Sequence, residues 1–256
     1  MARKKRKSDY NHIKLLAAVF FIALLIFAVL KWTQSRKVKF HRFDGFGIDL
    51  PTAFHVHGID VSRYQKRIAW DQVKDMSIKD IRINFAFIKA TEGSTLTDKY
   101  FKYNWATASK KQVVRGAYHF YTPNTDPKDQ AAYFISKVKL LPGDLPPVLD
   151  VEVIGNAKPA VFKNNLKIWL KQVETFYKVR PIIYTNADFY TKYLGNAFDE
   201  YPLWVAHYYE RNKPRIDREW TFWQHSDKGN VNGIKARVDF NVFNGDSVAF
   251  QNLLIP

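Results

Sequence analysis

The most uniform stretch of the chain lies near its N-terminus, where Leu15 to Leu30 are sixteen apolar residues in succession. As a helix rising ~1.5 Å per residue, this run spans about 24 Å, slightly less than the ~30 Å hydrocarbon core of a bilayer. Lys14 and Lys31 flank the run and can direct their ammonium groups towards the membrane surfaces. The pattern therefore predicts a transmembrane helix over 15–32.

Two other interpretations compete with a membrane anchor. A buried core helix is disfavoured because the run has no polar face. A cleaved signal peptide remains an alternative, although residues 31–36 (KWTQSR) are a poor match to a small-x-small cleavage site. We favour an uncleaved, single-pass signal anchor. Six Lys and Arg residues precede the run and five follow it closely, which predicts a cytoplasmic N-terminus and a main domain on the external face of the cell membrane.

The chain divides into four predicted parts. Residues 1–14 form a basic cytoplasmic tail, 15–32 the anchor, 33–54 a linker, and 55–256 one folded domain. The linker shows neither a helical nor a strand period, although its Phe residues could let part of it pack on the domain.

From residue 55 onward, short apolar runs alternate with longer amphipathic ones. Helical patterns cover 98–111, 126–140 and 159–178, with Pro127 and Pro159 placed favourably in the first turn of their helices. The predicted strands are 56–62, 84–91, 113–121, 146–153, 180–186, 202–208, 220–226 and 237–243. Eight strands mostly separated by helices predict an α/β barrel, which becomes irregular after residue 200, where the gaps are too short for full helices.

Charge and composition narrow the classes of function. The net charge is +16, but residues 1–42 hold 11 Lys and Arg against one acid, so the main domain is only mildly basic and we expect no nucleic-acid partner. The absence of Cys excludes disulfides, a thiolate nucleophile and a Cys-based zinc site. The histidines show no metal-binding spacing such as HExxH, and no Gly-rich phosphate loop is present. We therefore predict no required metal and no other cofactor.

Polar residues gather at the ends of the predicted strands, where parallel barrels carry their chemistry. They are Asp60, Ser62, Glu92, His119, Tyr121, Asp150, Glu152, Tyr184, Asn186, His207, Gln224 and Asp239.

The sharpest feature is Leu149-Asp150-Val151-Glu152-Val153, in which two acids alternate with apolar residues. On one strand both acids would point to the same face with Cα atoms roughly 6.5–7 Å apart. Mutual repulsion and burial would leave one proton donor beside one carboxylate, as cleavage of a glycosidic bond requires. A metal site or a salt-bridged pair is the alternative.

The segments around these acids resemble the family 25 glycoside hydrolases, the Chalaropsis-type lysozymes. The opening strand Gly58-Ile59-Asp60-Val61-Ser62-Arg63-Tyr64-Gln65 carries the likeness first. It continues, in the same order as in the family, through Phe85-Ala86-Phe87-Ile88-Lys89-Ala90-Thr91-Glu92-Gly93, Asn104-Trp105, Gly116-Ala117-Tyr118-His119-Phe120-Tyr121, Asp150-Val151-Glu152, Pro202-Leu203-Trp204-Val205-Ala206, Trp223-Gln224 and Val238-Asp239-Phe240-Asn241. Two departures are Tyr64, where many members carry Trp, and Lys66, where Gly often follows the Gln.

The resemblance implies a flattened, irregular α/β barrel that hydrolyses the β-1,4 bond between N-acetylmuramic acid and N-acetylglucosamine in peptidoglycan. It implies that Glu152 is the general acid and that Asp150 orients or stabilises the 2-acetamido group. By the same resemblance, Asp60 and Asp239 look like the family's other two site carboxylates. A retaining route with the acetamido oxygen as nucleophile is favoured, and a direct carboxylate nucleophile is the alternative. We expect a monomer whose partners are peptidoglycan and, through the anchor, the cytoplasmic membrane.

Aromatic and amide side chains complete the predicted sugar groove, because sugars stack on aromatic faces and hydrogen-bond through their hydroxyls. The candidates are Tyr64, Tyr118, Tyr121, Tyr184, Trp204, Trp223 and Gln224. The first and eighth strands of a barrel are neighbours, so we expect Asp60 and Asp239 to approach each other, with Asp150 and Glu152 across the barrel.

Two other functions remain open. The chain could be a catalytically weak wall-binding protein that keeps the groove, although all four acids are present. It could also be a metal-dependent barrel hydrolase, which a chelator would inhibit.

Overall fold

The computed structural model describes residues 2–35, 38–208, 210 and 212–256. Two compact units divide the chain, one ending at Lys39 and the other running from Phe40 to Pro256. Each unit is described separately.

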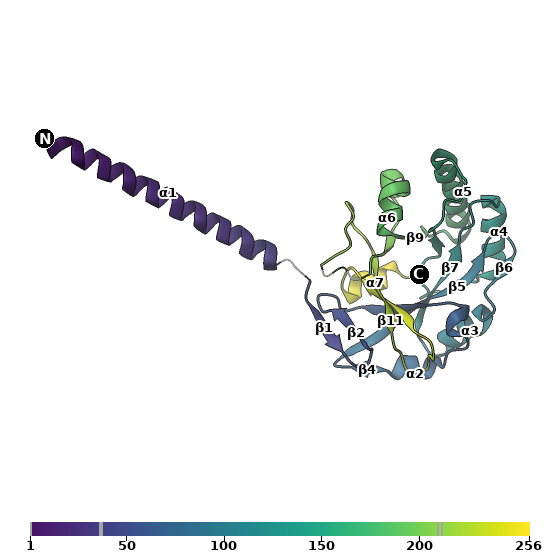
Figure 1. Ribbon diagram of the computed structural model, residues 1–256. Coiled ribbons are helices and arrows are strands. Elements are labelled where there is room, and N and C mark those ends of the chain that lie inside the picture. The colour runs from purple at the N-terminus through teal and green to yellow at the C-terminus, as the bar shows by residue number, and fades with distance from the viewer. Residues whose placement is uncertain (1, 36–37, 209, 211) are drawn as a thin grey trace. The chain divides into compact units, whose positions relative to one another are not determined.

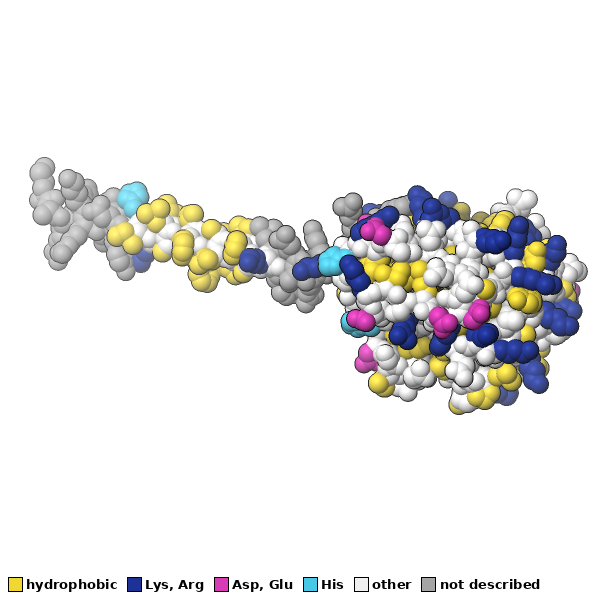
Figure 2. Space-filling view, turned by 90° about the horizontal axis from the view of Figure 1, so that it is seen from below, with side chains coloured by type: hydrophobic (Ala, Val, Ile, Leu, Met, Phe, Trp, Pro, Cys, Tyr) yellow, Lys and Arg dark blue, Asp and Glu magenta, His cyan; other side chains and the backbone are white. Residues whose placement is uncertain are grey.

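The first unit is a single helix, α1 (Ala2–Ser35) (Figure 1). Its segment Asn11–Val29 is long and apolar enough to cross a membrane, by length and composition. None of this segment is buried by the protein, and its large apolar side chains are exposed at consecutive positions, which lie on all faces of a helix; Figure 2 shows one of these faces. An all-round apolar surface is the pattern that lipid contact requires and that a soluble amphipathic helix lacks.

Eight strands of the second unit form a closed barrel. They follow the order β3-β12-β11-β10-β9-β8-β7-β5, and a further pairing of β3 with β5 closes the ring. Their bounds are β3 His57–Val61, β5 Ile81–Glu92, β7 Val114–Phe120, β8 Val148–Asp150, β9 Ile182–Asn186, β10 Leu203–Ala206, β11 Phe222–Gly229 and β12 Val238–Phe243. Each overlaps a predicted strand, and the predicted α/β barrel is confirmed.

The barrel is irregular at its C-terminal end, as expected. Strand β12 runs antiparallel to both β11 and β3, whereas the other pairs in the ring are parallel. The loop between β11 and β12 is too short for the crossover of a dozen or more residues that a parallel return needs. The β-carbon of a non-glycine residue at position 58 of β3 would lie 2.4 Å from the ring of Phe85, so only Gly58 fits there.

Side chains alternate between the two sides of the barrel wall. The side chains at alternate positions of each strand point into the barrel and fill its interior. They include the large rings of Phe85, Phe87, Tyr118, Trp204 and Phe222. The side chains at the other positions pack outward against the helices. Among the helices, α5 buries a stripe of Phe162, Leu166, Trp169, Leu170 and Val173.

Helices surround the strands (Figure 1). The longer ones are α3 (Phe101–Lys110), α4 (Pro127–Lys137) and α5 (Pro159–Tyr177), each within a predicted range. The shorter elements are η1 (Arg63–Gln65), α2 (Trp70–Asp75), β4 (Ser77–Ile78), β6 (Leu96–Thr97), α6 (Ala187–Phe189), η2 (Tyr190–Leu194), η3 (Gly195–Phe198) and α7 (Ser247–Leu253). Asp126 caps α4 through a side-chain bond from the amide of Lys128, which explains the start of that helix.

Part of the predicted linker is folded. Within 33–54, the strands β1 (Phe40–Phe43) and β2 (Ile48–Pro51) pair as an antiparallel hairpin. Their apolar side chains lie in the main core, and Phe46 and Leu50 are fully buried. The prediction that this range contains no strand is therefore wrong, because charged residues between the apolar ones obscured the pattern.

Candidate active site

The four predicted acids lie at one end of the barrel. Asp60 and Asp239 are direct partners in the register of β3 and β12. Asp150 is the last residue of β8, and Glu152 follows two residues later. The charge of Asp60 contributes to the raised pKa of Asp150, and the charge of Glu152 contributes to that of Asp239, so all four acids belong to one electrostatic cluster.

Asp60 is buried at the centre of a hydrogen-bond network. Its Oδ2 accepts bonds from Gln224 Nε2 at 2.7 Å and from Asn241 Nδ2 at 2.8 Å, and the indole of Trp204 donates to Asn241 Oδ1 at 2.7 Å. Burial and the neighbouring charge of Asp239 raise the pKa of Asp60 well above its ordinary value, against the opposing effect of the two amides. Burial, then the charge of Asp227, raise the pKa of Asp239 to about 6. Both pKa values are raised, so we expect the pair to keep a proton at higher pH than two ordinary aspartic acids would.

Asp150 and Glu152 differ in environment. Asp150 is buried, and its Oδ1 has no hydrogen-bond partner within the described structure. Burial and the charge of Glu152 raise the pKa of Asp150. Glu152 is exposed at the mouth, yet partial burial of its carboxyl group raises its pKa, and the hydroxyl of Tyr184 opposes that rise. The two acids do not share one strand as predicted, because β8 ends at Asp150 and Glu152 lies in the following loop.

One cation lies near the four acids and acts to lower the pKa of two of them. Lys89, on the interior face of β5, contacts Glu92 Oε2 at 2.7 Å, and its ammonium lies 4.8 Å from the centre of the Phe120 ring. Its positive charge acts to lower the pKa of both Asp150 and Glu152, so it opposes full protonation of that pair.

Four of the predicted groove residues lie on the interior face beside the acids. The Tyr184 hydroxyl donates to Gln224 Oε1 at 2.8 Å. Burial raises the pKa of Tyr118, and the nearby charges of Asp60 and Asp150 raise it further. Trp204 is fully buried and stacks on Phe87 with ring centroids 4.3 Å apart. Trp204 is thus a support for the network and not an open sugar platform.

Three other predicted aromatic residues lie elsewhere. The side chains of Tyr121 and Trp223 point away from the barrel interior. Both are almost fully buried between the barrel and the surrounding elements, where Tyr121 packs against Phe162. The structure does not bring them to the cleft, which corrects their prediction as groove residues. Tyr64, on η1, is 71% exposed, with the guanidinium of Arg63 5.4 Å from its ring centre, so its ring is open to a ligand.

Our prediction of site residues missed Lys89, Tyr208 and Asn241. Tyr208 donates to Gln224 Oε1 at 2.6 Å, completing the amide's contacts. Counting in steps of two from Asp239 gives Asn241, and from Trp204 gives Tyr208, so alternation along the strands could have found them.

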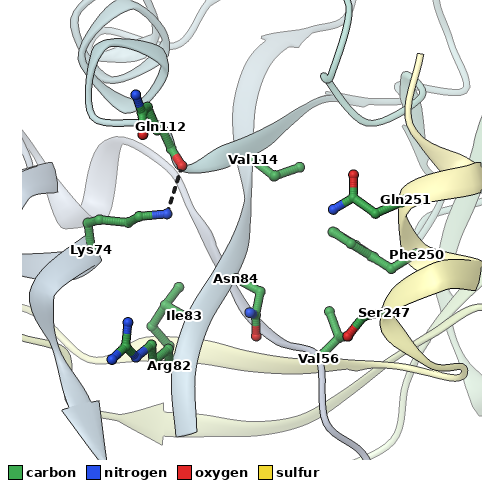
Figure 3. Close-up of a pocket in the computed structure, with 10 residues that line it drawn as sticks. All are labelled: Val56, Lys74, Arg82, Ile83, Asn84, Gln112, Val114, Ser247, Phe250 and Gln251. Atoms are coloured by element: carbon green, nitrogen blue, oxygen red, sulfur yellow. Dashed lines mark hydrogen bonds between the residues drawn. The ribbon is translucent and has the colours of Figure 1, made fainter. Parts of the chain in front are cut away.

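A second cavity lies at the opposite end of the barrel, where β5 and β7 begin (Figure 3). Its volume is about 230 Å³, and Lys74 donates across it to the backbone oxygen of Gln112 at 3.0 Å. None of the four acids lines it. Among the residues that the structure describes, no group of three or more His, Asp or Glu side chains is arranged to hold a metal ion.

Comparison with known proteins places this geometry in a family. The profile of glycosyl hydrolases family 25 matches residues 59–234. The uncharacterized protein YegX of Escherichia coli K12 is 48% identical over 200 residues, covering 78% of this chain and 74% of that protein. Lysozyme M1 of Streptomyces globisporus is 36% identical, covering 75% and 69%. A solved family 25 glycosyl hydrolase from Bacillus anthracis superposes with a TM-score of 0.73 at 32% identity, covering 85% of this chain and 98% of that one.

Proposed function

The chain belongs to family 25 of the glycosyl hydrolases, and from that membership we propose that it is a membrane-anchored muramidase. It is a glycoside hydrolase, and its relatives include proteins named lysozyme and N,O-diacetylmuramidase. The proposed substrate is peptidoglycan, cleaved at the β-1,4 bond between N-acetylmuramic acid and N-acetylglucosamine.

Glu152 is the proposed proton donor. Its raised pKa keeps it protonated at higher pH than an ordinary glutamic acid, and its exposure at the mouth leaves it free to reach a glycosidic oxygen. Protonation of that oxygen lets the bond to C1 break and the sugar on the far side leave as an alcohol. Glu152, now a carboxylate, would then take a proton from the attacking water.

Asp150 is the proposed partner of the substrate's 2-acetamido group, and its unpartnered buried Oδ1 is the single observation that supports this role best. A buried carboxylate oxygen without a donor favours a ligand that brings an N–H. Accepting that N–H would aim the acetamido oxygen at C1, where it displaces the leaving group and forms a cyclic oxazolinium ion. Water then opens the ring with net retention. The alternative is direct attack by a carboxylate on C1.

Asp60 and Asp239 are proposed to share one proton and to bind the sugar beside the bond that is cut. Tyr118, Tyr184 and Gln224 are proposed to contact the sugar from the interior wall, and Tyr64 from the rim. The helix α1 would hold the enzyme at the cytoplasmic membrane, with its N-terminus in the cytoplasm and the barrel outside.

Mass spectrometry of the soluble products from purified peptidoglycan tests the proposal. Products with N-acetylmuramic acid at the reducing end, released by wild type and lost in Glu152→Gln, are expected. Release of products ending in N-acetylglucosamine would refute the bond assignment. A thiazoline analogue of the oxazolinium ion should inhibit if the acetamido group is the nucleophile, whereas a trapped glycosyl-enzyme ester would support the carboxylate alternative.

A further inference from the structure

A basic groove, defined here as the surface around Lys66, Arg67, Lys99 and Lys235, lies at the end of the barrel that carries Asp60 and Asp239. Its volume is about 760 Å³. The loops after β3 and β6 and the loop between β11 and β12 form it. The four cations are exposed, whereas Ala69, Tyr100, Gly233 and Ile234 lie between them partly buried.

No acid balances these cations. None of the residues that line the groove is Asp or Glu, and none of the four cations forms an ion pair within the described residues. Two of them lie over aromatic rings, Arg67 4.9 Å from the centre of Tyr103 and Lys99 5.6 Å from that of Tyr100. Four like charges in one concave surface repel one another and attract an anion.

The groove is rigid. Gln65 Nε2 donates to the backbone oxygen of Arg237 at 2.8 Å, and the side chain of Asn104 bonds both Lys66 O and Ile68 N. The amide of Ala69 donates to Gly233 O at 3.1 Å, which ties the start of α2 to the loop between β11 and β12. A ligand would therefore meet preordered loops, which reduces the entropy lost on binding.

Lys66 holds an unusual backbone conformation. Its φ is 59° and its ψ is −143°, a region that suits glycine and strains a residue with a side chain. A lysine at this position costs stability that glycine would not. Such strain at an exposed position indicates that the lysine side chain has a role outside folding.

The groove is close to the catalytic acids along the chain. Lys235 precedes Asp239 by four residues and Lys66 follows Asp60 by six, so the fully extended chain allows at most about 14 Å and 22 Å between them. A substituent of a sugar bound in the cleft can therefore reach the groove.

We infer that the basic groove binds the carboxylate-bearing peptide that peptidoglycan carries on its muramic acid residues, an inference that rests on the proposed function. Where a peptide is attached, the lactyl carboxyl group of muramic acid is tied up in the amide bond to it, so the free carboxylates of such a strand lie on the peptide and not on the sugars. The attached peptides carry free carboxylates and small apolar side chains, which match the cationic rim and the partly apolar floor.

Kinetics on two forms of one substrate test this inference. Full-length wild type and the groove variant Lys66→Gln/Lys99→Gln/Lys235→Gln are compared on glycan strands that bear peptides and on the same strands stripped of peptide by an amidase, with the lactyl carboxylates that the amidase frees then converted to amides. Wild type should show a lower KM for the peptide-bearing strands, and added salt should weaken this preference. In the groove variant, the ratio of the two KM values should move towards one, about a fivefold change for the loss of a few exposed ion pairs.

A matched control distinguishes the effect of removing charges from the groove from the effect of lowering the net charge of the protein. Lys128→Gln/Lys167→Gln/Lys171→Gln removes three charges from α4 and α5 and should keep the wild-type ratio. An unchanged ratio in the groove variant, or the same change in the control, would overturn the inference. Cleavage of the peptide-free strands reports the proposed muramidase activity alone, so its failure is distinguishable.

Direct binding gives an answer independent of catalysis. A synthetic acidic stem peptide without sugar should bind the Glu152→Gln chain more tightly than its amidated form, and Lys66→Gly should weaken that binding while raising the melting temperature. Equal binding of both peptides, or binding of linear polyphosphate without binding of the peptide, would overturn the inference.

Discussion

Asp60 and Asp239 face each other as register partners on the antiparallel strands β3 and β12, and burial raises the pKa of both, so we expect the pair to share one proton. The amides of Gln224 and Asn241 both donate to one oxygen of Asp60, which leaves its other oxygen for that proton. The pair therefore carries about one negative charge near neutrality instead of two.

Replacing Asp239 by Asn should stabilise the protein at high pH. The native pKa of Asp239 is raised from 3.8 to about 6, so the folded state binds its proton more tightly than the unfolded chain does. Stability conferred by that proton is fully present below about pH 4 and is lost as the pH rises towards 6. The variant should thus gain up to about 3 kcal/mol over wild type at pH 8 and nothing at pH 3.5. Thermal unfolding at both pH values measures this, with the exposed Asp217→Asn as a control that should show no such difference.

Replacing Glu152 by Gln should remove activity and spare the fold. Gln keeps the shape but cannot donate an acidic proton, so the rate should fall ~10²–10⁴-fold. Glu152 is exposed, and Gln can keep its hydrogen bond with the hydroxyl of Tyr184, so the melting temperature should stay within a degree or two. Near wild-type cleavage of peptidoglycan by this variant would disprove the assignment.

Replacing Lys89 by Met should shift the pH–rate profile to higher pH. The ammonium of Lys89 favours the ionised forms of Asp150 and Glu152, so its loss raises the pKa of both acids. The acidic limb of the profile should shift to higher pH. Lys89→Arg retains the charge and should keep the limb nearly in place, and Lys89→Met/Glu92→Gln tests whether the unpaired Glu92 causes the shift. An unmoved limb in Lys89→Met would show that the cation does not tune the site.

The sequence was sufficient to locate the barrel strands because each is a short apolar run between polar loops. Strand direction is not encoded in such runs, and the reversal of β12 could be inferred only from the short connection between Gly229 and Val238. The position of Tyr121 was mistaken because adjacent residues of a strand point to opposite faces. Since Tyr118 faces the interior, Tyr121 must face outward.

The positions of the four acids could be predicted from their motifs. The interactions that shift the pKa values of these acids could not. The charge of Lys89 on Asp150, the indole of Trp204 behind Asn241, and the contact of Asp60 with Asp239 all depend on distances across the barrel. The apolar positions of the hairpin β1–β2 were missed for a related reason. Phe43, Phe46 and Ile48 are separated by charged or glycine residues, and only tertiary packing makes them core.

Two truncations should separate the anchor from the folded unit. Removal of residues 1–39 deletes α1 alone and should leave the cleavage of peptidoglycan fragments intact, since Phe40 begins the compact unit. Removal of residues 1–54, the end of the predicted linker, also deletes Phe43, Phe46, Ile48 and Leu50 from the core. Burial of each such side chain contributes ~1.5–3 kcal/mol, so the loss approaches the whole ~5–15 kcal/mol stability of a typical domain. We expect the shorter chain to be insoluble or to lack a cooperative melting transition. If calorimetry showed equal transitions for both truncations, the hairpin would not belong to the core, and residues 40–54 would be a linker after all.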